Sequence, residues 1–156
     1  MLQKIVRKKL AARGGRFVIV ASIYNGRYVN AMLRAAKAEI LRAGGALQIV
    51  RVPGAYEIPV VAARLARAAA GGPPPAAIIC LGVILRGATT HAQHIGEAVS
   101  NALTQIQVQH EVPVIHEVLL LENEQQARER CLSRTHNRGM EAAQTALAMA
   151  RVMRGL

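Results

Sequence analysis

The segment from Arg86 to His91, Arg-Gly-Ala-Thr-Thr-His, combines groups that can bind an anion and transfer a proton. It joins a continuous apolar run to a helical pattern, so it forms the loop between a buried strand and a helix. Threonine hydroxyls and the free N–H groups of a helix start make an anion site, and histidine suits proton transfer near neutral pH. We therefore interpret the loop as an anion-binding segment with His91 as its proton-transfer group. The alternative is an ordinary helix cap followed by a surface histidine.

A second set of candidate residues follows the Pro53-Gly54 turn. Tyr56 can stack on a planar ligand, and Glu57 can accept hydrogen bonds from the N–H edge of that ligand. The alternative is a plain turn in which the dipole of the next helix favours a glutamate. Tyr24 follows an earlier apolar run and has the same ambiguity, because its neighbour Asn25 is also a typical helix cap.

The other titratable residues give weaker signals. Arg130 has no spacing that distinguishes it from a surface arginine. His91 and His94 share a helix face, but no third ligand accompanies them, so we expect no metal site. Cys80 and Cys131 form no Cys-x-x-Cys pair. This argues against a disulfide framework or a thiolate metal site and favours a cytoplasmic location.

Strand and helix patterns alternate along the chain, and they must position these residues. Apolar, β-branched runs predict strands over 16–23, 46–52, 76–85 and 112–121. Apolar residues at helical spacing predict helices through Val29–Ile40, Ile58–Ala69 and Ile95–Ile106, and two further helical stretches over 123–133 and 139–153. This alternation predicts a parallel sheet covered by helices on both faces, a three-layer α/β sandwich. Ligands of such folds bind beyond the carboxyl ends of the strands, where the candidate loops lie.

Composition is that of one globular domain with a basic N-terminal arm. The chain has 156 residues, 52% of them hydrophobic, and a net charge of +11. No uninterrupted apolar segment approaches the ~18 residues of a membrane span, so we expect no membrane association.

We divide the chain into an arm at 1–15 and a domain at 16–156. The arm is either a solvated tail or a polyanion-binding segment. It contains no aromatic residue and the chain has no nucleic-acid motif, so nucleic acid is not an expected partner.

Several of these segments together resemble one family. The most specific are VPGAYEIP at 52–59 and LGVILRGATTH at 81–91, supported by SIYN at 22–25, VPVI at 112–115, EQQARER at 124–130 and HNRG at 136–139. From about residue 16 to residue 150 the chain resembles lumazine synthase, the penultimate enzyme of riboflavin biosynthesis. The resemblance implies a flavodoxin-like fold with a four-stranded parallel sheet. It also implies a homo-oligomer, pentameric or built from pentamers, in which the arm can extend a neighbour's sheet.

The resemblance also implies a reaction and the residues for it. The family condenses 5-amino-6-(D-ribitylamino)uracil with 3,4-dihydroxy-2-butanone 4-phosphate through a Schiff base, with loss of phosphate and water, and uses no cofactor or metal. His91 corresponds to the family's proton-transfer residue, and Ala88, Thr89 and Arg130 correspond to its phosphate site. The residues that correspond to the pyrimidine and ribityl site are Tyr24, Ala55, Tyr56, Glu57, Val83, Ile84, Leu85 and His116.

The chain departs from the family most clearly around His116. The family commonly has Phe-Gly-Val-Leu-Thr-Thr there, with the Phe supplied by a neighbouring subunit, whereas residues 116–121 are His-Glu-Val-Leu-Leu-Leu. These changes motivate an alternative function, in which the fold and assembly are kept but a flavin-like ligand is bound without turnover. A third interpretation, nucleic-acid binding through the arm, has only the basic charge to support it.

Overall fold

Four parallel strands form the centre of the computed structural model, which describes residues 3–67 and 72–156. They are β1 (Arg16–Ser22), β2 (Ala46–Val52), β3 (Ala77–Leu85) and β4 (Val114–Leu121), arranged in the order β2-β1-β3-β4. Every neighbouring pair is parallel. This order is that of a flavodoxin-like, doubly wound sheet and confirms the predicted fold class.

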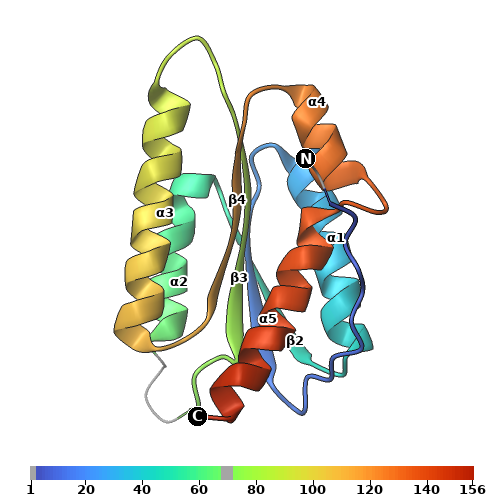
Figure 1. Ribbon diagram of the computed structural model, residues 1–156. Helices are drawn as coiled ribbons and strands as arrows, with labels where there is room; N and C mark the ends of the chain where they lie inside the picture. Colours follow the sequence, from blue (N-terminus) through green and yellow to red (C-terminus); the bar gives the residue numbers. More distant parts are fainter. Residues whose placement is uncertain (1–2, 68–71) are drawn as a thin grey trace.

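Helices cover both faces of the sheet (Figure 1). One face carries α2 (Ile58–Ala66) and α3 (His91–His110), and the other carries α1 (Gly26–Arg42), α4 (Glu124–Ala127) and α5 (Arg138–Arg154). The helices therefore make the outer two of three layers. None of the helices within the described residues is long and apolar enough to cross a membrane.

The predicted elements occur where expected, with small differences at their ends. β3 and β4 begin one and two residues later than predicted, at Ala77 and Val114. The final residues of the helix expected over Ile58–Ala69 lie outside the described residues. The stretch 123–133 is wound in two ways, as α4 and then as a π-helical segment, η2 (Arg128–Leu132). Such wider turns occur frequently at functional sites.

Alternation along the buried strands builds a core on each face of the sheet. Phe17 and Ile19 of β1 pack with α1 and α5, whereas Val18 and Val20 pack with α2 and α3. This follows from the two-residue period of a strand. β3 is buried along almost its whole length, as its continuous apolar sequence predicted. Cys80 lies inside this strand, and burial raises the pKa of its thiol to about 12.

The His-Asn-Arg-Gly segment at 136–139 starts α5 and seats it on α1. The Asn137 side chain caps the helix by accepting a hydrogen bond from the Gly139 N–H at 2.9 Å, and it donates to the Cys131 carbonyl at 2.6 Å. A Cβ at Gly139 would overlap the backbone of Met32 in α1. The two helices therefore approach so closely that only glycine fits at this crossing.

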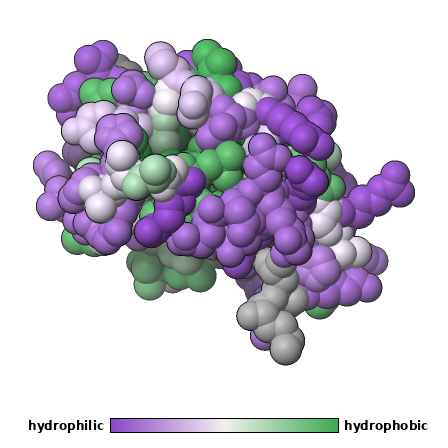
Figure 2. Space-filling model, turned by 90° about the horizontal axis from the view of Figure 1, so that it is seen from above, coloured by the Kyte–Doolittle hydropathy of each residue, from purple (hydrophilic) through white to green (hydrophobic). Residues whose placement is uncertain are grey.

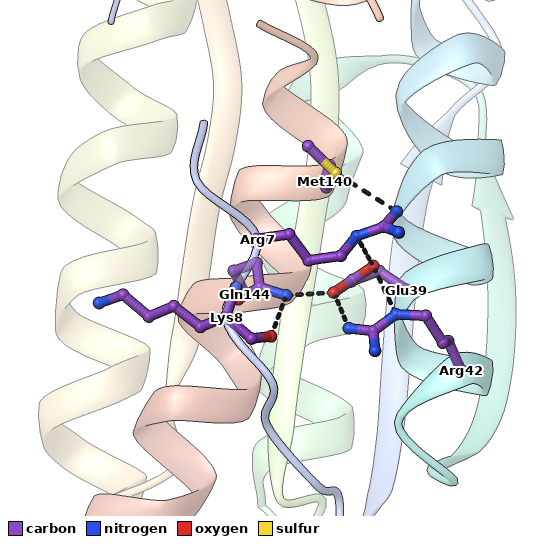
Figure 3. Close-up of polar contacts among 6 residues, drawn as sticks. All are labelled: Arg7, Lys8, Glu39, Arg42, Met140 and Gln144. Atoms are coloured by element: carbon purple, nitrogen blue, oxygen red, sulfur yellow. Dashed lines mark hydrogen bonds and ion pairs between the residues drawn. The ribbon is translucent and has the colours of Figure 1, made fainter. Parts of the chain in front are cut away.

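The N-terminal arm runs along α5 and α1 of its own chain, where a buried carboxylate holds it (Figure 3). Glu39 of α1 is only 1% exposed and contacts Arg7 of the arm, with 3.2 Å between Nε and Oε2. Arg42 and Gln144 donate hydrogen bonds to the same carboxylate. Gln144 also accepts from the Lys8 N–H at 3.1 Å, so the arm is bound through both its backbone and a side chain.

The cations around Glu39 keep its carboxylate ionised. Burial by itself would raise the pKa of Glu39, but the hydrogen bond and charge of Arg42, the charge of Arg7 and the hydrogen bond from Gln144 together lower it. A carboxyl group with a lowered folded-state pKa stabilises the fold above its unfolded pKa of about 4.3. That contribution is lost as the pH falls through the lowered folded-state value.

We predict that Glu39→Gln lowers the unfolding free energy at pH 7 by about 1–3 kcal/mol, because a charge-assisted hydrogen-bond network is lost. Stability of the variant should also change less than that of the parent between pH 5 and pH 3. Thermal unfolding at fixed protein concentration measures both effects. Glu124→Gln is the matched control, since Glu124 makes an ion pair with Arg128 on the exposed surface and such pairs contribute little. Equal effects of the two variants would contradict the role of Glu39.

Candidate active site

A cleft of about 920 Å³ opens at the carboxyl ends of the strands. Seen from this end, hydrophobic surface is exposed between hydrophilic side chains near the middle of the molecule (Figure 2). Nine of the predicted site residues line this cleft: Tyr24, Ala55, Tyr56, Glu57, Val83, Ile84, Leu85, Thr89 and His91. Ala88 lies in the same loop, between the lining residues Gly87 and Thr89. The volume falls within the usual range for a small-molecule site.

Two of the chain's four aromatic rings are exposed, and both border the cleft. Tyr24 is 73% exposed and Tyr56 is 63% exposed, whereas Phe17 and Tyr28 are buried in the core. Rings left in water beside a hollow of this size are available to stack on a flat ligand. Glu57 places a carboxylate beside them, in the short helical turn η1 (Ala55–Glu57) that precedes α2.

The Tyr24 loop is fastened to both neighbouring strands. The N–H groups of Ile23 and Tyr24 donate to the carbonyls of Val52 and Pro53, at 2.8 and 3.0 Å. On the other side, the Asn25 side chain donates to the Val83 carbonyl at 2.7 Å. Asn25 does occupy the N-cap position of α1, as the alternative interpretation has it, but its side chain makes no cap hydrogen bond and bonds to β3 instead.

The loop after β3 places His91 at the start of α3, beside the cleft. Thr89 accepts a long hydrogen bond, 3.4 Å, from the His91 N–H. Arg86, at the start of this loop, makes an ion pair with Glu122 at 3.1 Å and does not line the cleft. Of the residues from Arg86 to His91, the cleft is lined by Gly87, Thr89 and His91.

Arg130 and His116 do not lie in the cleft of the same chain. Arg130 sits in η2 and lines a separate cavity of about 540 Å³ between the arm and α5. Lys4, His136 and Arg138 border this cavity too. His116 lies on β4, in a third hollow beside α3 and α5. One chain therefore displays two of the predicted site residues on surfaces away from the other ten.

Sequence reasoning missed the partner of Glu117, the residue that stands where the family commonly has glycine. Glu117 is 5% exposed and accepts a hydrogen bond from Arg138 at 2.7 Å. Arg138 also donates to Glu141 at 2.6 Å. Burial raises the pKa of Glu117, and this effect exceeds the lowering by Arg138. The arginine in the His-Asn-Arg-Gly segment was the available signal, since a buried acid requires a cation.

Hydrogen bonds on both sides fix the imidazole of His116. Its Nδ1 accepts from the Val118 N–H at 3.1 Å, and its Nε2 lies 2.7 Å from the Ser100 hydroxyl. Ser100 donates its own proton to the Gly96 carbonyl at 2.8 Å. The hydroxyl is thus left to accept from Nε2, and the neutral tautomer that carries its proton on Nε2 satisfies every group.

The described residues bring no three histidine, cysteine or acidic side chains together in a way that could hold a metal ion. His91 and His94 both line the cleft, and the remaining lining residues that can act as ligands do not join them in such a group. The side chains that do line the cleft can supply stacking, hydrogen bonding and proton transfer.

A doubly wound parallel sheet with a ligand-sized cleft at its carboxyl edge is typical of α/β enzymes that act on small molecules. Residues 14–154 match the sequence profile of the 6,7-dimethyl-8-ribityllumazine synthases, and the chain is a member of that family. The 6,7-dimethyl-8-ribityllumazine synthase of Aquifex aeolicus strain VF5 is 38% identical over 156 residues, which cover 98% of this chain and 99% of that protein. Membership confirms the predicted resemblance and supports an enzyme of riboflavin biosynthesis. It does not favour a binding protein without turnover.

We predict that His116 titrates below the ordinary histidine pKa of about 6.5. Partial burial of the ring lowers its pKa. A proton on Nδ1 would also point at the Val118 N–H, which donates to that nitrogen in the neutral form. The neutral form should therefore predominate at pH 6.5 and above. Histidine side-chain NMR titration measures this, and the resonance absent from His116→Phe identifies the ring. A midpoint at or above 6.5 would contradict the tautomer assigned here.

Proposed function

We propose that this protein condenses 5-amino-6-(D-ribitylamino)uracil with 3,4-dihydroxy-2-butanone 4-phosphate to give 6,7-dimethyl-8-ribityllumazine, phosphate and water. Family membership supports the reaction. The observation that carries the proposal within the structure is the cleft, because it gathers two exposed tyrosine rings, a carboxylate, a threonine and a histidine at one edge of the sheet. These are the groups needed to hold a flat polar ring and move its protons.

Within the cleft we assign the uracil to the side lined by Tyr24 and the end of β3. The Tyr24 ring would pack on the pyrimidine, and the backbone of Val83, Ile84 and Leu85 would offer it hydrogen bonds. The segment Ala55–Glu57 would bind the ribityl chain. These residues lie on the loop after β1, in the turn η1 after β2 and at the end of β3, which the parallel sheet brings to one edge.

We assign the phosphate of the second substrate to Ala88 and Thr89, beside His91. Arg130 would complete this phosphate site from a neighbouring chain, since it lies outside the cleft of its own chain. His116 would likewise come from a neighbour and stack on the pyrimidine in its neutral form. The active unit is then a homo-oligomer, for which we propose a homopentamer or an assembly of pentamers. We also propose that it acts in the cytoplasm without a cofactor.

We expect His91→Ala to slow turnover by about 10²–10⁴-fold, the usual contribution of a general acid or base. His91 should relay protons during Schiff-base formation and phosphate elimination. Incubation with both substrates and detection of lumazine fluorescence measures the rate, and sedimentation checks that the assembly is intact. His94→Ala is the matched control, because His94 lines the same cleft one helical turn later. Full activity of His91→Ala would show that His91 does not transfer protons in the reaction.

We expect Arg130→Ala to raise the KM for the butanone phosphate more than the KM for the uracil, because a charge-assisted contact to phosphate is lost.

A site that combines His91 of one chain with Arg130 of its neighbour allows a sharper experiment. Co-expression of Arg130→Ala with His91→Ala should restore activity, since some clefts would combine an intact His91 with a neighbour's intact Arg130. Mixing the two separately assembled variants controls for exchange. No recovery in co-assembled particles would show that both residues act within one chain.

A further inference from the structure

Asn25 occupies the place where two strands of the sheet part. β1 pairs with β3 only as far as Ala21 opposite Leu81, whereas β3 continues beside β4 to Leu85. On its other side, β1 stays paired with β2 through Ser22 opposite Val52. The last four residues of β3 therefore have no backbone partner on the β1 side, and this unpaired edge forms part of the cleft.

The Asn25 side chain takes over the missing strand contact. Its amide nitrogen donates to the Val83 carbonyl at 2.7 Å, across 58 positions of sequence. The Asn25 backbone is in the left-handed region, with φ of 55°, a conformation that asparagine tolerates better than most residues. A carbonyl oxygen has two lone pairs, so the bond from Asn25 holds the Val83 carbonyl and leaves a second lone pair free.

We propose that Asn25 is a positioning residue, which fixes the unpaired end of β3 against the Tyr24 loop and so sets the distance between the stacking ring and the strand backbone in the cleft. This rests on the proposed function, since the uracil is the ligand assigned to that side. The other fastening of the loop, through Ile23 and Tyr24, goes to the β2 side and leaves the β3 side to Asn25.

Asn25→Gly tests the side chain separately, because it removes the amide but keeps the backbone conformation. Glycine adopts positive φ without strain, so the start of α1 should fold normally while the bond to Val83 is lost. In substrate-free protein, hydrogen–deuterium exchange of residues 22–28 and 82–86 should become faster. The KM for the uracil should rise about 3- to 10-fold, the effect of one lost hydrogen bond, and the KM for the butanone phosphate should stay unchanged.

Asn30→Ala is the matched control. Asn30 lies in the first turns of α1, the helix that follows Asn25, and accepts a hydrogen bond from Arg51 at 2.8 Å. It does not line the cleft. Asn25→Asp supplies a second variant, because aspartate also tolerates the left-handed backbone but its carboxylate would face the Val83 carbonyl. It should raise the same KM more than glycine does.

Unchanged exchange in substrate-free Asn25→Gly would overturn the proposal; if the KM for the uracil still rose, Asn25 would be a direct substrate contact instead. Equal changes of both KM values, or faster exchange with no change of KM, would overturn it as well. If the parent protein forms no lumazine, the proposed function fails. The exchange comparison would then still decide whether Asn25 holds the end of β3.

Discussion

The cleft exists because β1 and β3 stop pairing before β3 ends. Parallel strands send their carboxyl ends to one edge, and in the order β2-β1-β3-β4 the chain after β1 turns toward β2 while β3 continues beside β4. A gap opens between them that no backbone fills. The loops that carry Tyr24, Tyr56 and His91 border this gap, so ligand-binding capacity is a direct consequence of strand order rather than of any one side chain.

Two buried carboxylates connect segments of this strongly basic chain that are distant in sequence. Glu39 binds the arm to α1 and α5, and Glu117 binds β4 to the start of α5 through Arg138. A buried acid without a cation would be costly, so each fixes the place of an arginine. Within the described residues, these two buried glutamates thus fix where segments distant in sequence meet, because each binds an arginine from another segment.

The sequence predicted the elements well because buried strands and amphipathic helices have different periods. Val18–Val20 and the apolar run at 76–85 needed no tertiary information. The cleft residues were also predictable, since loops after parallel strands must share an edge. What sequence alone did not predict depends on contacts between distant segments: the bond from Asn25 to Val83, the pairing of Glu117 with Arg138, and the pairing of Arg86 with Glu122. Arg130 and His116 were identified only by resemblance, and the structure places them away from the cleft.

The contact between the arm and α5 also constrains the order in which the molecule is built. Lys8 and Gln144 are separated by 136 residues, so the arm leaves the ribosome long before the helix that completes its binding surface. Such distant contacts form late, because the intervening chain must be ordered first. The arm therefore cannot make its full set of contacts until α5 has been synthesised and has packed on α1. For the same reason it should be among the first segments to detach when the protein is heated.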